Sequence, residues 1–194
     1  MNIYTDMAKV LEPKQIGVAR LEKYEIPEFY RYIYNTPNQE YVRLWVDGEM
    51  MMSNTNMEKR TSLDFVRHAE GDVLICGLGI GLVLLPLFES EKVKSITVVE
   101  KYQDVIDCVL PQIKPYDKEN KLTVICKDCF EFYTKDRFDT IFIDIWANIN
   151  RDIYEEEMKP LKNKYKRYLK PDKRSMQNVF VWAEYNARYE VRLL

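Results

Sequence analysis

The sequence predicts an α/β protein built on a doubly wound, mostly parallel β-sheet, with a β-hairpin extension at the N-terminus. From residue 71 onward, apolar strand-like runs alternate with helical patterns, an order that is typical of parallel sheets. The runs end on a glycine-rich turn or just before an acid, in order the turn at 77–81, Glu100, Asp128 and Asp144. Ligands of such sheets bind at the carboxyl ends of the strands, so these residues are the first candidates for a site.

Length and composition exclude several classes of protein. The 194 residues can bury a full core in one domain with a small appendage. A net charge of −2 gives no general attraction to nucleic acid or to a membrane surface, so neither is expected as a partner. The longest uncharged stretch, Val73 to Phe88, contains three glycines and a proline and is shorter than the roughly 20 residues of a spanning helix. The first residues lack the apolar run of a secretory signal, so we expect a cytoplasmic protein.

The four cysteines and the single histidine predict neither a metal site nor a disulfide. Cys126 and Cys129 form a CxxC, but there is no second pair and His68 is remote in the sequence, so a zinc site would lack ligands. A redox dithiol remains the alternative to two small buried residues.

Residues 1–55 are expected to form a β-rich extension and residues 56–194 the main domain. Lys14 to Ile26 predicts one strand. Two further strand-like runs flank Asp47-Gly48, which favours a two-residue type I′ turn because both central residues must accept positive φ. The tyrosine-rich segment 27–37 predicts a packed short helix or loop. Tyrosine is common at subunit contacts, so this segment is compatible with a homodimer.

The main domain should contain four strands, a C-terminal segment that is strand or helix, and five helices. The strands are expected at Val73–Cys76, Ile96–Val99, Lys121–Cys126 and Phe138–Ile143. The helices are expected within residues 55–69 and at Leu82–Glu91, Tyr102–Leu110, Asn150–Met158 and Leu161–Leu169. Phe130 to Tyr133 should add a short helical turn. Pro111 and Pro160 should stop or interrupt helices, since proline lacks an N–H. The last segment is Asn178 to Tyr185, where β-branched residues favour the strand. Too few residues remain for a seven-stranded sheet, so the fold should be shortened at its C-terminus.

The GLGIG turn at residues 77–81 predicts a site for an adenosine-type cofactor. Glycines let backbone N–H groups approach a ligand, and the acid that ends the next strand, Glu100, lies where ribose hydroxyls can bind. A dinucleotide fingerprint would place Gly or Ala at position 82, which is Leu here, so hydride transfer is disfavoured. A purely structural turn is the alternative.

A GxGxG turn with an acid after the second strand resembles the class I S-adenosylmethionine-dependent methyltransferases. The resemblance implies a Rossmann-like fold and S-adenosylmethionine as cofactor. It also implies that the turn binds the methionine part and that the acids bind ribose and adenine. The cofactor residues are then Gly77, Gly79, Gly81, Glu100 with its neighbour Lys101, and Asp128 with its neighbour Cys129. Asp144, at the end of the fourth strand, would be the catalytic residue that faces the acceptor.

Within that superfamily the sequence is most similar to the spermidine synthase branch. LWVDG at 44–48 is similar to that branch's LxLDG hairpin, LICGLGIG to its IIGGGDGG turn, and FDTIFIDIW to its YDVIITDSSDP. Two acids of that branch are replaced by Ile80 and Ala147, although acids would hold the ammonium groups of the substrates. We therefore expect methyl transfer to a small molecule. Aminopropyl transfer from decarboxylated S-adenosylmethionine, or cofactor binding without catalysis, are the alternatives.

Several candidates have a plainer alternative, and one of them is Asp128, since an acid at that position can also cap the following helix. Asp144 can act as a general base, or it can orient Trp146 or cap a helix. Trp146 and Tyr154 can wall the acceptor pocket, or they can pack in the core. The basic segment from Lys159 to Arg174 can bind phosphates, but a solvated helix face is the favoured explanation.

Overall fold

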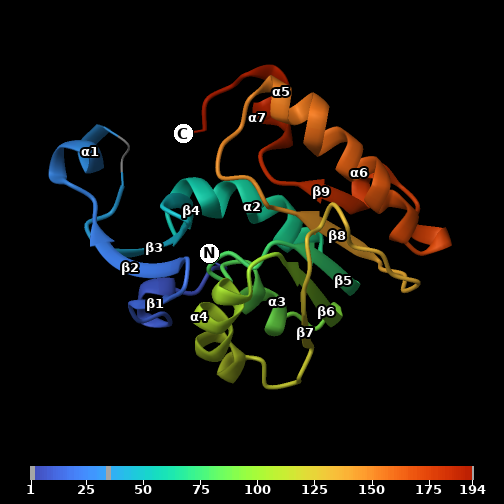
Figure 1. Ribbon diagram of the computed structural model, residues 1–194, viewed down its shortest axis with the longest axis horizontal. Helices are drawn as coiled ribbons and strands as arrows, with labels where there is room; N and C mark the ends of the chain where they lie inside the picture. The colour runs from blue at the N-terminus through green and yellow to red at the C-terminus, as the bar shows by residue number, and fades with distance from the viewer. Residues whose placement is uncertain (1–2, 34–35, 194) are drawn as a thin grey trace.

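The computed structural model describes residues 3–33 and 36–193 and contains two β-sheets (Figure 1). One is antiparallel, with the order β1-β2-β3-β4, and the other is parallel, with the order β7-β6-β5-β8-β9. The predicted α/β class, with a parallel sheet after an N-terminal antiparallel extension, is confirmed.

The antiparallel sheet consists of β1 (Lys14–Ile16), β2 (Ala19–Glu25), β3 (Glu40–Val46) and β4 (Glu49–Ser53). The prediction of one strand from 14 to 26 is wrong, because the chain turns back at Gly17, whose φ is 50°. Asp47 and Gly48 have φ values of 50° and 81°. Positive φ at both positions is what a type I′ turn requires, so the predicted hairpin is confirmed.

The tyrosine-rich segment forms α1 (Glu28–Ile33), while residues 34 and 35 of that segment lie outside the described residues. The helix is not packed as expected: Phe29 is 69% and Tyr32 is 89% exposed. A homodimer through this segment stays a prediction.

The parallel sheet has β5 (Gly71–Cys76) at its centre. The other strands are β6 (Val93–Glu100), β7 (Leu122–Cys126), β8 (Thr140–Ile143) and β9 (Val179–Val181). Cys76 lies opposite both Val99 of β6 and Ile143 of β8. The carboxyl ends of the three central strands therefore meet at one edge, where the glycine turn begins. The final segment is a strand, as favoured, and it is followed by α7 (Glu184–Tyr189).

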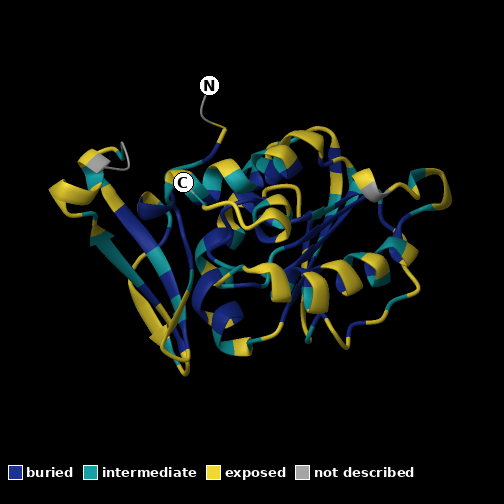
Figure 2. Ribbon diagram, turned by 90° about the horizontal axis from the view of Figure 1, so that it is seen from above, coloured by how far each residue is buried: buried dark blue, intermediate teal, exposed yellow. Residues whose placement is uncertain are grey.

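Helices cover both faces of this sheet (Figure 1), because alternate strand residues enter different cores. Val73 and Ile75 pack with α2 (Asn56–His68), α3 (Leu84–Phe88) and α4 (Gln103–Ile113). Leu74 and Cys76 pack with the helical segment of residues 151–168. That segment is made of α5 (Arg151–Ile153), a π-helical stretch (Tyr154–Met158), α6 (Lys159–Tyr165) and a 3-10 turn (Lys166–Tyr168). Figure 2 shows the central strands buried between the exposed outer faces of the helices.

One hydrophobic core is shared by the extension and the main domain. Leu21 and Leu44 of the antiparallel sheet belong to the same buried cluster as Val73 and Ile75. The predicted boundary at residue 55 falls between β4 and α2 and stays a prediction.

Two prolines lie inside helices that they were expected to interrupt. Pro111 is within α4, and the carbonyl of Asp107, four residues earlier, accepts a hydrogen bond from Lys14 Nζ at 3.1 Å. This external donor replaces the N–H that proline lacks. Before Pro160 the helix widens into its π-helical stretch, where the N–H of Lys159 donates to the carbonyl of Tyr154. The wider turn lets the helix pass the proline.

Two other predicted elements are shorter or absent. The helix expected at 82–91 is limited to α3. The helical turn expected from Phe130 to Tyr133 is absent, because the chain makes only a non-helical turn at residues 129–131.

Several lysines of the basic segment hold parts of the fold together. Lys170 Nζ lies 2.8 Å from Asp72 Oδ2 and 2.6 Å from Asp139 Oδ2. Lys162 pairs with Glu184 at 2.6 Å, and Lys164 Nζ donates to the carbonyl of Phe130 at 2.7 Å. Because these cations have internal partners, the segment is better explained by structure than by phosphate binding.

We expect Phe65→Ala to lower the free energy of unfolding by about 3–5 kcal/mol. Phe65 of α2 is 1% exposed and stacks on Phe142 of β8, with ring centroids 4.3 Å apart. Urea denaturation measures the change, with Phe29→Ala in the exposed helix α1 as the control. Equal losses in the two variants would contradict the packing described here.

Candidate functional site

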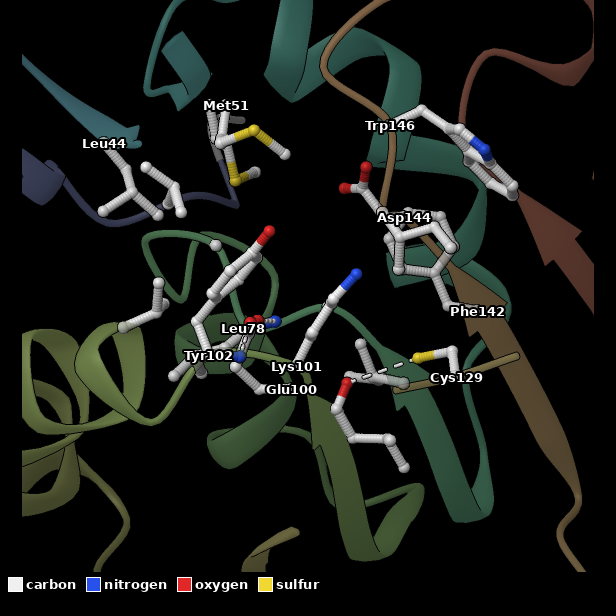
Figure 3. A pocket seen from close by; sticks show the side chains of 18 of the residues that line it. Leu44, Met51, Leu78, Glu100, Lys101, Tyr102, Cys129, Phe142, Asp144 and Trp146 are labelled. Carbon is white, nitrogen blue, oxygen red and sulfur yellow. Dashed lines mark hydrogen bonds between the residues drawn. The ribbon is translucent and has the colours of Figure 1, made fainter. Parts of the chain in front are cut away.

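A cavity of about 210 Å³ lies at the carboxyl edge of the parallel sheet. Its walls come from the β3–β4 hairpin, the glycine turn and the ends of β6, β7 and β8. Figure 3 shows Leu44 and Met51 on one side of the cavity, Cys129 on the opposite side, and Asp144 with Trp146 on a third. Of the predicted site residues, the cavity is lined by Gly77, Gly79, Glu100, Lys101, Asp128, Cys129, Asp144 and Trp146.

Close packing explains the glycines of the turn. A Cβ at Gly77, whose φ is 95°, would lie 2.0 Å from the carbonyl oxygen of Asp144, so no side chain fits between the turn and the end of β8. A Cβ at Gly79 would lie 2.4 Å from the sulfur of Met52. The third predicted glycine, Gly81, does not line the cavity; it faces the side chain of Ile113 in α4.

The carboxylate of Glu100 ties the turn to the end of β6. Its Oε2 accepts from the N–H of Leu78 at 2.8 Å, and its Oε1 accepts from the N–H of Tyr102 at 2.9 Å. Burial raises the pKa of Glu100, and the hydrogen bonds from backbone N–H groups oppose that rise. Each carboxylate oxygen has a second lone pair, so Glu100 can hold the turn and still accept from a ligand hydroxyl.

Asp128 and Lys101 form an ion pair on the β7 side of the cavity, with Lys101 Nζ 3.2 Å from Asp128 Oδ2. Asp128 Oδ1 accepts from the N–H of Phe130 at 2.8 Å. Burial opposes the ionisation of Asp128, but the N–H of Phe130 and the ammonium of Lys101 outweigh it and hold its pKa below the ordinary value. Asp128 is therefore an ionised acceptor at neutral pH.

The CxxC residues have different surroundings. Cys129 is 3% exposed at the cavity wall, and its thiol donates to the carbonyl of Val99 at 3.6 Å. Cys126 is exposed, which corrects the expectation of two buried cysteines, and all four cysteines are free. Within residues 3–33 and 36–193, no group of three or more His, Cys, Asp or Glu side chains could hold a metal ion.

Asp144 presents its carboxylate to the cavity (Figure 3) and has no ion-pair partner among the described residues. Burial raises the pKa of Asp144 well above its ordinary value, and the nearby carboxylate of Glu58 raises it further. Glu58 belongs to α2 and is 7% exposed. Burial raises the pKa of Glu58 to about 7, against the N–H of Ser53 and the indole of Trp182. Of these two poorly compensated acids, only Asp144 lines the cavity.

Of the two aromatic residues that were predicted to wall the pocket, one lines the cavity and the other packs in the core. Trp146 lines the cavity, and its indole donates to Glu157 Oε2 at 2.7 Å. Tyr154 does not line it. It is 6% exposed in the core on the other face of the sheet, with the guanidinium of Arg188 5.8 Å from its ring centroid. Tyr154 begins the π-helical stretch, where its buried side faces the strands.

Sequence reasoning missed two contributions to the site. The hairpin supplies Leu44, Val46 and Met51 to the cavity wall, although the sequence suggested only a separate extension. Glu58 was also missed, because an acid in a mainly polar helix gives no sign of burial. The Phe65 stack, which fixes the buried side of α2, depends on a residue 77 positions away, Phe142.

The sheet order and the cavity at its carboxyl edge define a Rossmann-like protein of the methyltransferase fold. The chain belongs to the spermine/spermidine synthase domain family, whose family model matches residues 49–181. The predicted resemblance to the spermidine synthase branch is thereby confirmed. Comparison with curated protein sequences gave no match.

Two solved spermidine synthases show the same fold. A spermidine synthase in complex with the transition state analogue AdoDATO aligns with a TM-score of 0.52 and 19% identity, over 83% of this chain and 53% of that chain. The spermidine synthase from Thermotoga maritima aligns with a TM-score of 0.53 and 19% identity, over 83% and 54%. The CcbJ methyltransferase from Streptomyces caelestis aligns with a TM-score of 0.47 and 16% identity, over 59% of this chain and 46% of that chain. The chain thus spans about half the length of the spermidine synthases that it matches.

The high pKa of Glu58 should make stability depend on pH. Between its ordinary pKa of 4.5 and its folded value of about 7, the folded chain holds a proton that the unfolded chain releases. The free energy of unfolding should therefore fall as the pH rises through this window. Glu58→Gln removes the ionisation and should be more stable than the wild type at pH 8, by up to roughly 3 kcal/mol.

Urea denaturation of both proteins at pH 4 and pH 8 checks this, because the difference between them cancels the contribution of other carboxylates. A difference that is the same at both pH values would contradict the burial of Glu58 as a charge-sensitive group.

Proposed function

We propose that this chain binds S-adenosylmethionine in the cavity and transfers its methyl group to a small molecule. Membership of the spermine/spermidine synthase domain family supports an adenosyl sulfonium donor. Glu100, with free lone pairs at the centre of the cavity, would accept from the ribose hydroxyls. Asp128 and Lys101, on the β7 side, would lie beside the adenine. The hydrogen-bonding residues of the cavity thus follow one another in the order of the ribose and the adenine of such a nucleoside.

The apolar wall of the cavity at the hairpin favours methyl transfer over aminopropyl transfer. With the adenosine at Glu100 and Asp128, the tail of the donor would extend toward Leu44, Val46 and Met51, which are apolar. An aminopropyl arm ends in an ammonium group, and burying that charge without an acid is costly. Ile80, in place of the family's acid in the turn, is fully buried and does not line the cavity. This wall therefore disfavours decarboxylated S-adenosylmethionine.

A methionine tail has a partner in the turn. The N–H of Gly79, which lines the cavity, donates to no acceptor among the described residues, whereas those of Gly77 and Gly81 bond to the carbonyls of Val99 and Leu78. Unused N–H groups of a glycine turn are suited to a carboxylate. The tail that keeps its carboxylate is therefore the better match.

The chemistry asks little of the protein beyond alignment and a proton acceptor. S-adenosylmethionine supplies an electrophilic methyl group on its sulfonium. Binding donor and acceptor in line removes most of the entropic cost of their encounter. Asp144, at the cavity wall beside Trp146, would accept the proton that the acceptor loses. Aminopropyl transfer is the second candidate, favoured by the family.

Calorimetry with S-adenosylmethionine and its decarboxylated form tests this choice. Wild type should bind S-adenosylmethionine more tightly. Met51→Glu places an acid at the hairpin wall and should shift the preference toward the decarboxylated form by about tenfold or more. Met50→Glu, at a residue that is 45% exposed and does not line the cavity, is the matched control. A wild-type preference for the decarboxylated form would reverse our order of candidates.

Glu100→Gln should weaken the binding of S-adenosylmethionine by roughly tenfold to a hundredfold, because a charge-assisted hydrogen bond contributes about 1.5–3 kcal/mol. Calorimetry measures the loss, and thermal unfolding verifies that the turn is still held. Glu131→Gln, at an exposed acid that pairs with Lys127, is the control. Unchanged affinity would exclude Glu100 from the ribose site.

A further inference from the structure

The two acids Glu58 and Asp144 lie on packed faces of α2 and β8, although 86 positions separate them in the chain. Glu58 and Phe65 both belong to the buried face of α2, and Phe65 stacks on Phe142 of β8. Asp144 follows two residues after Phe142, so its side chain leaves the chain on the same side as that ring. The charge of Glu58 raises the pKa of Asp144, but only Asp144 lines the cavity and can touch a ligand.

No cation compensates this pair among the residues that the structure describes. The groups around Glu58 are Ser53 at the end of β4, Tyr24 of β2 and Trp182 after β9. The indole of Trp182 donates to Thr61 Oγ1 at 2.9 Å, one turn along α2. These neighbours are polar but carry no positive charge.

The charged groups of the cavity do not relieve Asp144 either. Lys101, the one cation in its lining, pairs with Asp128, and the remaining charged side chains there are Glu100 and Glu157. Two adjacent acids in a poorly solvated place resist losing both protons, since the second negative charge would face the first. One proton shared by the pair is the low-energy state at neutral pH.

A role in capping α2 does not explain Glu58. Thr55 and Glu58 stand at the positions of a capping box, in which the acid bonds back to the start of the helix. Here the side chain of Thr55 makes no capping hydrogen bond. Glu58 is instead 7% exposed and belongs to the buried face of α2, together with Ser62 and Phe65.

We infer that Glu58 is a positioning residue that controls the protonation of Asp144, so that the pair holds one proton and Asp144 can take a second from the acceptor. This inference rests on the proposed function for the identity of the reaction. In the step, a lone pair of the neutral acceptor forms the new bond to the methyl carbon. The carbon–sulfur bond breaks and leaves its electrons on sulfur, which becomes a neutral thioether. The acceptor's proton goes to the carboxylate of Asp144.

The test is a carbon-13 NMR titration of the Asp and Glu side-chain carboxyls in the full chain. Glu58→Gln keeps the size of the side chain and one oxygen acceptor but removes the charge. Asp144 should then titrate at a lower pH than in the wild type. Asp64→Asn changes the charge of the same helix at an exposed side chain and should leave the titration of Asp144 where it was.

If Glu58→Gln does not fold, the titration of the wild type alone tests the inference. Coupled acids give two inflections in each titration curve, because each resonance senses the other group. Single, independent inflections for Glu58 and Asp144, or equal shifts in Glu58→Gln and Asp64→Asn, would overturn the inference.

The titration needs no donor and no acceptor, so it can succeed where the proposed function fails. If the titration of Asp144 shifts as expected but calorimetry detects no binding of S-adenosylmethionine, the coupling of Glu58 to Asp144 is supported and the proposed function is wrong. If S-adenosylmethionine binds equally to the wild type and to Glu58→Gln while the titration of Asp144 does not shift, the proposed function is retained and the coupling is wrong.

Discussion

The carboxylate of Glu100 makes the contact on which the site depends. A glycine turn has little side-chain packing to fix its path, and here its path is fixed by hydrogen bonds. Glu100 accepts from Leu78 in the turn and from Tyr102 after β6, while the N–H of Gly77 bonds to the carbonyl of Val99. The turn is thus attached to the neighbouring strand at both its backbone and a side chain.

The second constraint is the close approach of this turn to its neighbours. Gly77 lies against the backbone at Asp144, and Gly79 lies against the sulfur of Met52. Contact with Met52 places the hairpin over the turn, and contact at Asp144 brings the end of β8 to it. The cavity is the space between these three parts. The antiparallel sheet therefore supplies apolar residues to the cavity wall, and the strand ends of the parallel sheet supply its acids.

The uneven distribution of charge gives the two sides different chemistry. At the β7 side Asp128 is balanced by Lys101, so that region can accept hydrogen bonds without a large electrostatic cost. At the end of β8 Asp144 has no such balance, nor does the buried Glu58, so the pKa values of both carboxyls are raised. The role that we propose for Asp144, a proton acceptor near neutral pH, needs this kind of surrounding.

The sequence by itself determined the order of strands and helices, the glycine turn and the acids at the strand ends. Alternating apolar runs and strand-end acids are local features, and parallel pairing brings such ends to one edge. Only the tertiary structure decided that Gly81 and Tyr154 pack away from the cavity, that Met51 lines it, and that Glu58 is buried on the face of α2 that packs against β8. These outcomes depend on contacts between residues far apart in the chain, such as Phe65 with Phe142. Local periodicity does not record which side of a polar helix or hairpin such contacts will bury.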